Sequence, residues 1–208
     1  MRFVVTAGPT REAIDPVRFL SNRSSGKMGY AIAEAALAAG HSVKLISGPS
    51  CLARPEGTEF ISITTSDELH DEVHRAVHQC DALVMCAAVS DYKPAAFESR
   101  KTKKEKAPFA LELIPTRDIL ASLPRENRNY LVVGFAAETH DLKRNAQKKL
   151  REKNCDAIVA NDVSRPDSGM ESDENAVTIF FRNGEMKSIS RAAKKIIARE
   201  LVKIISKM

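Results

Sequence analysis

The sequence predicts an α/β fold, a Rossmann-like three-layer sandwich with a mostly parallel sheet and a C-terminal antiparallel hairpin extension. Short β-branched runs alternate with longer segments of helical period, which is typical of β-α-β units. Two short runs, 83–87 and 131–133, are apolar without alternation, as in parallel strands buried on both faces. Near the C-terminus the pattern changes to two strands joined by a tight turn. The 208 residues therefore predict one domain, 1–208, with the hairpin extension at about 175–190.

Six segments have the composition of strands in the parallel sheet: 3–7, 42–46, 60–63, 82–87, 130–136 and 157–160. Helices are expected between them at 26–40 and 141–153, and a short one after Asp118. Another helix is expected to begin at Thr65, because Glu68 three residues later completes a capping box. The hairpin should join 176–181 to 186–189 through a turn of two or three residues, before a terminal helix that begins at Ser190.

The composition excludes several classes of protein. No apolar run approaches the roughly 18 residues that span a bilayer, and the N-terminus lacks a signal-peptide pattern, so we expect a cytoplasmic protein. The cysteines show no C-x-x-C spacing, so neither a disulfide framework nor a zinc site is expected from Cys51, Cys80, Cys86 and Cys155. The net charge of +5 comes largely from 100–106 and 143–153, which suits an anionic partner, either nucleic acid or a phosphorylated small molecule.

Two connections, 8–25 and 89–108, are too long to be plain turns. Each follows the carboxyl end of a predicted strand, where open α/β sheets bind their ligands. In the first, Ser24, Ser25 and Gly26 precede an apolar helix, at the positive end of its dipole. This segment either binds an anion or only caps the helix, with Gly29 allowing close packing; Asn22, Arg23 and Lys27 add donors that a cap does not need.

Ala87 and Ala88 lie at the end of the strand before the second connection, and Asp91 lies near the start of that connection. Small residues at a strand end let a planar group lie against the backbone. Asp91 could bind a ribose hydroxyl, or a metal ion through water. Alternatively, it is only a helix cap or a surface residue. The basic segment 98–106 that follows is either a solvated loop or a flexible lid over a polyphosphate.

The predicted helix at 141–153 carries two lysines on its inward face. At about 100° per residue, Lys149 and Lys153 fall within about 20° of Leu142, on the side of the apolar residues Ala146 and Leu150. Inward lysines either extend along apolar surface to water or meet an anion, and two at this spacing repel each other unless an anion lies between them.

Three histidines, His70, His74 and His78, follow one another at i, i+4 spacing. Their order does not match the zincin motif, which needs Glu directly after the first His. Helical angles place them beside the apolar face of their helix, so we expect a solvated flank rather than a metal site.

Several motifs together resemble one family, phosphopantothenate-cysteine ligase, also called phosphopantothenoylcysteine synthetase. The matching segments run from one end of the chain to the other, in the family's order: 5–12, 15–18, 21–29, 87–91, 134–139, 149–153 and 160–163. The resemblance implies that the carboxylate of 4'-phosphopantothenate attacks the α-phosphate of a nucleoside triphosphate, CTP in the bacterial branch. Pyrophosphate leaves with Mg²⁺ assistance, and the cysteine amine then displaces CMP from the acyl-cytidylate. Many bacteria fuse this domain behind a flavin-dependent decarboxylase, and this chain looks like a free-standing bacterial-type domain.

The resemblance also implies residue roles. Asn22, which would hold the acyl intermediate, and Lys101, which would aid the first half-reaction from the basic loop, are the implied catalytic residues. The implied substrate-binding residues are Arg18, Asn22, Ala87 and Ala88. The implied nucleotide-binding residues are Ser24, Ser25, Gly26, Lys27, Met28, Gly29, Asp91, Lys101, Asp118, Ile119, Phe135, Lys149 and Lys153. The metal ligands are not identified by the motifs, although Asp91 is a candidate through water.

The chain departs from the family before its short helix, where Thr116 and Arg117 stand in place of the frequent Asn-Pro. The rival enzyme class, an NAD(P)-dependent oxidoreductase of short-chain type, needs a glycine-rich turn and Y-x-x-x-K, and neither is present. A nucleic-acid-binding module would place aromatic residues among the lysines, and only Tyr92 and Phe97 lie near the first basic segment. CTP and ATP both stay open as the nucleotide, with CTP favoured by the resemblance. The hairpin and the family together favour a homodimer, with small-molecule substrates and neither nucleic acid nor membrane as partners.

Overall fold

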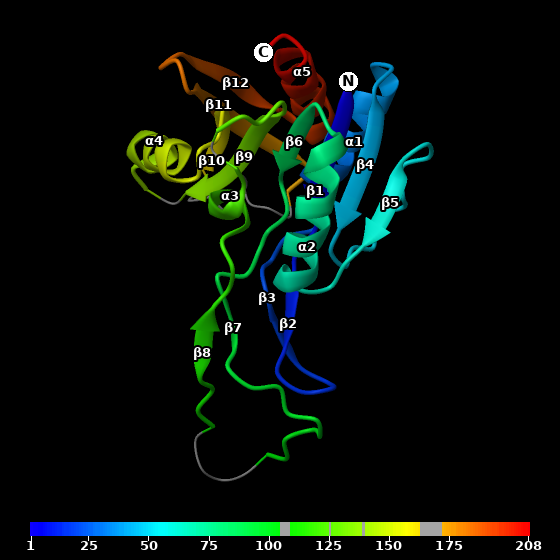
Figure 1. The fold of residues 1–208 in the computed structure, drawn as a ribbon, viewed down its shortest axis with the longest axis vertical. Helices are drawn as coiled ribbons and strands as arrows, with labels where there is room; N and C mark the ends of the chain where they lie inside the picture. The colour runs from blue at the N-terminus through cyan, green and yellow to red at the C-terminus, as the bar shows by residue number, and fades with distance from the viewer. Residues whose placement is uncertain (105–108, 125, 139, 163–171) are drawn as a thin grey trace.

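The structure, a computed structural model, describes residues 1–104, 109–124, 126–138, 140–162 and 172–208 (Figure 1). Its main sheet has eight strands in the order β12-β11-β10-β9-β6-β1-β4-β5. The strands are β1 (Arg2–Ala7), β4 (Ser42–Ser47), β5 (Glu59–Ser62), β6 (Ala82–Met85), β9 (Leu131–Glu138), β10 (Ala157–Asp162), β11 (Glu174–Phe181) and β12 (Met186–Ala193). All six predicted strands of the parallel part are therefore present.

The six strands from β5 to β10 pair in parallel. Thr6 at the end of β1 lies beside Ile46 of β4 on one side and Met85 of β6 on the other. Counted along the chain, these strands have the order 3-2-1-4-5-6, which is that of dinucleotide-binding folds. The order reverses between β1 and β6, so the crevice at the carboxyl ends of these two strands is the expected ligand position.

Helices cover both faces of the sheet, which confirms the three-layer prediction (Figure 1). α1 (Lys27–Ala38) and α5 (Lys194–Ile205) pack against each other and against one face. The opposite face is covered by α2 (Ser66–Ala76), η1 (Val77–Gln79), α3 (Ile119–Ser122) and α4 (Leu142–Glu152). α2 begins with the predicted capping box, in which Thr65 Oγ1 accepts from the Glu68 amide at 3.1 Å. Within the described residues, no helix is long and apolar enough to span a bilayer.

The C-terminal hairpin is present and longer than predicted, because β11 and β12 extend to eight residues each. Four residues, 182–185, separate the two strands, one more than the two or three predicted. The Gly184 amide bonds to the Phe181 carbonyl, and Gly184 is in the left-handed region at φ 91°. The prediction that the terminal helix begins at Ser190 is wrong. Residues 190–193 continue β12 in pairing with β11, and the helix starts at Lys194.

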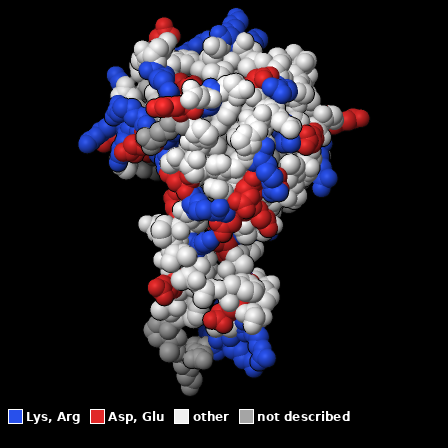
Figure 2. Space-filling view, viewed as in Figure 1, with Lys and Arg blue, Asp and Glu red and all other residues white. Residues whose placement is uncertain are grey.

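As the sequence suggested, the two long connections are not plain turns. Their described residues form a projection that leaves the sheet, which we call the arm (Figure 1). The first connection contains the ribbon of β2 (Arg11–Ala13) and β3 (Phe19–Ser21). The second ribbon of the arm pairs β7 (Tyr92–Pro94), in the second connection, with β8 (Leu113–Pro115), which lies just beyond the predicted end of that connection at 108. Figure 2 shows the arm as a narrow projection from the body, with basic side chains gathered near its tip. Among the described residues of the second connection, the exposed basic ones are Arg100, Lys101, Lys103 and Lys104.

The histidines are not fully solvated, because His70 and His74 are half-buried and His74 Nε2 lies 2.9 Å from Ser122 Oγ of α3. The reason is that α3 packs beside α2, which the helical angles of α2 alone could not show. Lys106, Pro108, Thr139 and Val163, at the edges of predicted segments, lie outside the described residues.

Candidate active site

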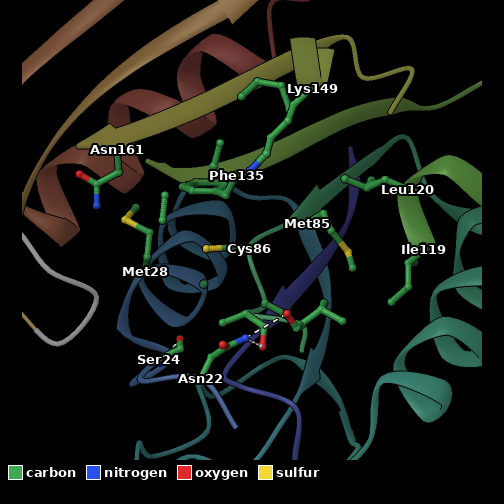
Figure 3. Close-up of a pocket in the computed structure, with 18 of the residues that line it drawn as sticks. Asn22, Ser24, Met28, Met85, Cys86, Ile119, Leu120, Phe135, Lys149 and Asn161 are labelled. Atoms are coloured by element: carbon green, nitrogen blue, oxygen red, sulfur yellow. Dashed lines mark hydrogen bonds between the residues drawn. The ribbon is translucent and has the colours of Figure 1, made fainter. Parts of the chain in front are cut away.

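A cavity of about 510 Å³ opens at the carboxyl ends of β1, β6 and β9. Its walls come from the segment 22–29 after β1, the segment 85–91 after β6 and residues 135–137 of β9, together with α3 and α4. The cavity therefore occupies the crevice where the strand order reverses, and its volume is in the range of small-molecule sites. In Figure 3, Asn22 and Lys149 approach this space from opposite sides.

Two buried threonines hold the segments after β1 and β6 together. Thr6 Oγ1 accepts hydrogen bonds from the amides of Cys86 and Ala87, both at 3.0 Å. Thr10 Oγ1 accepts one from the Ser90 amide, also at 3.0 Å. Both threonine side chains are fully buried, so these bonds are shielded from water. The backbone edge at Ala87 is therefore a fixed wall against which a planar group can lie.

Asn22 is fastened to that wall. Its Nδ2 donates to the carbonyl oxygen of Val89 at 2.9 Å and to that of Ala88 at 3.2 Å (Figure 3). Both amide protons of Asn22 are thus directed at the segment after β6, while its Oδ1 remains an acceptor. The side chain connects the two halves of the crevice and lines the cavity.

The start of α1 presents a positive helix end to the cavity. Gly26, at the N-cap in the left-handed region (φ 82°), provides no side-chain cap, and the first turn contains no acidic residue. α1 can begin this close to β1 because Gly29 has no side chain, since a Cβ there would lie 2.6 Å from Ala7 Cβ. Ser24, Gly26, Lys27, Met28 and Gly29 all line the cavity. An anion is the ligand that this arrangement favours.

Lys149 and Lys153 of the α4 region both line the cavity, as the helical angles predicted. Each is held by a carboxylate: Lys149 Nζ lies 2.8 Å from Glu138 Oε1 of β9, and Lys153 Nζ binds Asp118 Oδ2. Asp118 also caps α3, because its Oδ1 accepts from the Ala121 amide at 3.0 Å. The repulsion expected between the two lysines is thus relieved by carboxylates, and both ammonium groups stay at the cavity wall.

Arg18 lies in the arm, in the turn between β2 and β3. Its Nε donates to Asp15 Oδ2 at 2.9 Å, and its Nη2 donates to the Thr102 carbonyl at 2.8 Å. The same Asp15 carboxylate accepts from the Thr102 amide at 3.2 Å, so it joins the first ribbon to the basic segment that contains Lys101. The arm therefore has a polar centre of its own.

Asp15 provides a pH-dependent prediction. Hydrogen bonds from Arg18 are the main reason why the pKa of this carboxyl lies well below the usual aspartate range. Its contribution to the stability of the arm is therefore complete above the ordinary aspartate pKa of about 3.9, and is lost only as the pH falls through the lowered value. We expect the carboxyl-carbon NMR signal of Asp15 to titrate below pH 3.8, and Arg18→Gln to raise that midpoint. An unshifted wild-type midpoint would contradict the ion pair.

The structure brings most of the predicted site residues together. Those that line the cavity are Asn22, Ser24, Gly26, Lys27, Met28, Gly29, Ala87, Ala88, Asp91, Asp118, Ile119, Phe135, Lys149 and Lys153. Three predicted residues are not part of the lining formed by the described residues: Arg18, Ser25 and Lys101. Ser25 lies between the two lining residues Ser24 and Gly26, and its carbonyl oxygen accepts a hydrogen bond from Ser50 Oγ at 3.0 Å.

Comparisons with known proteins agree with this geometry. The family model described as DNA/pantothenate metabolism flavoprotein C-terminal domain matches residues 1–208. The chain belongs to this family. The coenzyme A biosynthesis bifunctional protein CoaBC of Bacillus subtilis (strain 168) is 45% identical over 204 residues, covering 98% of this chain and 50% of that protein. CoaBC of Escherichia coli (strain K12) is 42% identical over 190 residues, covering 89% and 47%.

Solved structures place the fold in the same family. The crystal structure of the C-terminal domain of CoaBC has a TM-score of 0.85 and 40% identity, covering 100% of this chain and 94% of that chain. The DNA/pantothenate metabolism flavoprotein from Streptococcus pneumoniae has a TM-score of 0.84 and 26% identity, covering 100% and 99%. The chain spans about half the length of the curated CoaBC relatives that it matches.

Several wall residues of this DNA/pantothenate metabolism flavoprotein C-terminal domain were missed from the sequence. Asn161, Asn175 and Lys194 line the cavity and are buried, and burial lowers the pKa of Lys194. The sequence signal that could have identified Asn161 as a wall residue is its position as a polar residue at the end of an apolar strand. Cys86 also lines the wall, and burial raises the pKa of its thiol to about 12, so it stays protonated at neutral pH.

Proposed function

We propose that this chain is a ligase of coenzyme A biosynthesis, which joins 4'-phosphopantothenate to L-cysteine through an acyl-nucleotide. One observation carries the proposal: a single cavity brings together Asn22, the positive end of α1 and the ammonium groups of Lys149 and Lys153. A nucleoside triphosphate beside a second, phosphorylated acid needs this combination of anion-binding groups and a fixed backbone wall. The names of the CoaBC relatives support the same pathway.

In the first step, a carboxylate oxygen of phosphopantothenate attacks the α-phosphorus of the nucleotide, and the bond to pyrophosphate breaks. A carboxylate is a weak nucleophile towards a charged phosphate, so the phosphate charge has to be neutralised and the reactants aligned. Lys149 and Lys153, each paired with a carboxylate in the structure, would donate to the phosphate oxygens together with the start of α1. The wall at Ala87 and Ala88 provides a flat edge for the reactants, and Phe135 a ring face for the base.

In the second step, the cysteine amine attacks the acyl carbon, the bond to the nucleoside monophosphate breaks, and the amine loses its proton to solvent. Asn22 lies beside the carbonyl groups of Ala88 and Val89, where the acyl chain would lie. It would hold the mixed anhydride in place until the amine arrives. No residue is needed as a general base in the first step, because the attacking carboxylate is already ionised.

The residues present fit a Mg²⁺ ion that is carried mainly by the substrate's phosphates. Among the described residues, no group of three or more His, Cys, Asp or Glu side chains could hold a metal ion. Asp91 places one exposed carboxylate at the cavity wall, a hard oxygen donor that can bind Mg²⁺ directly or through water. When bound, the ion would neutralise charge on the leaving pyrophosphate.

Product analysis tests the proposed function. Incubation with phosphopantothenate, cysteine and either CTP or ATP should give 4'-phosphopantothenoylcysteine by mass spectrometry, together with pyrophosphate and the nucleoside monophosphate. We propose CTP as the preferred nucleotide on the basis of the family resemblance, and the cytoplasm as the site of a reaction between small phosphorylated metabolites. No amide with either nucleotide would refute the ligase, whereas faster turnover with ATP would refute only the nucleotide preference.

We propose that the functional form is a homodimer whose contact is the arm. Large apolar side chains on the arm are exposed, with Phe19 47%, Tyr92 56% and Phe97 58% accessible. Apolar side chains gathered on a thin projection are typical of an interaction surface, and a second copy of the arm presents the same surface. The exposed edge strand β12, with Met186, is the alternative contact.

Light scattering tests the dimer. The wild-type protein should have about twice the chain mass of 22.9 kDa. Phe97→Ser should shift it towards the monomer, and Met186→Ser, which exchanges another exposed apolar side chain, on the hairpin, should not. A monomeric wild-type protein would refute the dimer, and dissociation by Met186→Ser alone would move the contact to the hairpin.

A further inference from the structure

The N-terminal end of α2 is the point where the arm joins the body. The Arg11 amide of β2 donates to the Thr64 carbonyl just before α2 at 2.7 Å. Glu12, also in β2 and buried, accepts from the Ser66 amide at 2.8 Å. The first ribbon is therefore hydrogen-bonded to the N-terminal end of α2.

The second ribbon joins α2 through one carboxylate, Asp67. Lys93 of β7 places its Nζ 2.5 Å from Asp67 Oδ2, and Arg117, which follows β8, donates from Nε to Asp67 Oδ1 at 3.0 Å. Arg117 Nη2 also lies 3.1 Å from a carboxylate oxygen of Asp71, one turn further along α2. The Lys93 hydrogen bond is the main reason why the pKa of Asp67 is lowered, and Arg117 acts in the same direction. Both strands of the second ribbon are thus connected to Asp67, β7 through Lys93 and β8 through Arg117, which follows it.

Arg117 is also the residue before Asp118. Asp118 holds Lys153 and caps α3, and Arg117, Asp118 and Ile119 all line the cavity. A chain of direct contacts therefore runs from Asp67 of α2 through Arg117 to Asp118 and the Lys153 ammonium group.

We propose that Asp67 and Arg117 are positioning residues for the nucleotide side of the cavity, which fix Asp118 and, through it, Lys153. This inference rests on the proposed function, since it assigns Lys153 to the triphosphate. The side chains of Asp67 and Arg117 are 39% and 48% exposed, so their ion pair contributes little to the free energy of unfolding. The ion pair acts on geometry instead. Because one planar guanidinium binds two carboxylates, it restricts the conformation of the segment between β8 and α3.

The test compares Asp67→Asn and Arg117→Ala with a matched control on the same helix, Arg75→Ala. Arg75 forms an exposed ion pair with Glu72 at 2.6 Å, and among the described residues it makes no ion pair with the arm. We expect Asp67→Asn and Arg117→Ala each to raise the KM for the triphosphate by about fivefold or more, because a misplaced binding group weakens binding. The KM for cysteine and the thermal midpoint should change little, and Arg75→Ala should resemble the wild type.

Two further variants sharpen the result. The effect of the Asp67→Asn, Arg117→Ala double variant on the KM should be smaller than the product of the two single effects, because both changes break the Asp67–Arg117 ion pair. Arg117→Lys should recover only part of the affinity, because an ammonium group lacks the planar fork. If Asp67→Asn leaves the KM for the triphosphate unchanged, the inference is wrong, and an effect of Arg117→Ala alone would mean that Arg117 contacts the nucleotide directly.

A measurement without turnover separates the inference from the proposed function. Hydrogen exchange in peptides that span 113–123 should become faster in Asp67→Asn and Arg117→Ala and stay at the wild-type rate in Arg75→Ala. If the wild type forms no amide, the proposed function fails, whereas the exchange rates still report whether the connection to α2 orders this segment. Unchanged exchange in both test variants would overturn the inference.

Discussion

Asn22→Ala is expected to abolish nearly all amide formation, with a loss of about 10²-fold in turnover. The side chain has two tasks that no neighbour can take over. Its Nδ2 connects the segment after β1 to the carbonyl groups of Ala88 and Val89, and its place on the cavity wall is where the acyl intermediate would be held. Without it the acyl-nucleotide should still form but should react less well with cysteine, so pyrophosphate release should exceed amide formation.

Asn183→Ala is the matched control for that experiment. Asn183 is an exposed asparagine in the hairpin turn, where its Nδ2 bonds to Glu185 at 2.9 Å, remote in the fold from the cavity. It should leave turnover unchanged. Pyrophosphate and amide are measured in the same reaction, by a coupled assay and by mass spectrometry. An Asn22→Ala protein that produces both at the wild-type rate would remove Asn22 from the mechanism.

Lys101→Ala is expected to have the second large effect, a loss of about 10²-fold in acyl-nucleotide formation. Lys101 is exposed in the arm and is not among the residues that line the cavity in the described part of its own chain. If the arm contacts a second copy, as the proposed dimer requires, its basic segment would serve the partner's cavity. Lys103→Ala and Lys104→Ala, which remove neighbouring exposed charges, are the matched controls and should have small effects.

Mixing the two inactive variants tests this arrangement. In a mixed dimer of Lys101→Ala and Asn22→Ala chains, one cavity would have an intact Asn22 and receive an intact Lys101 from its partner. Random mixing should therefore restore about a quarter of the wild-type turnover, since half of the dimers are mixed and each has one intact site of two. If mixed dimers form but turnover is not restored, Lys101 acts within its own chain. If Lys101→Ala alone is fully active, Lys101 has no catalytic role.

The parts of the fold that depend on local pattern were predictable. The buried parallel strands follow from apolar runs without alternation, and α2 from its capping box at Thr65 and Glu68. The arm was not predictable, because β2, β3, β7 and β8 are three residues each and two of them contain proline. Their pairing depends on how the two connections meet in space.

The site was predictable where one element carries the signal. Lys149 and Lys153 could be placed from helical geometry alone, and they do line the cavity. Their carboxylate partners, Glu138 and Asp118, come from other elements and were not predictable in the same way. Lys194 was missed for the same kind of reason, because the start of α5 reaches the wall only after the hairpin has returned the chain to it.

The most direct test of the proposed reaction follows the carboxylate oxygen atoms of phosphopantothenate. The central claim is that the cavity places the phosphopantothenate carboxylate against the α-phosphorus of the nucleotide. With phosphopantothenate labelled by ¹⁸O in its carboxylate, mass spectrometry should find one labelled oxygen in the nucleoside monophosphate and none in the pyrophosphate. Label in inorganic phosphate, or an unlabelled nucleotide product formed together with the amide, would contradict it.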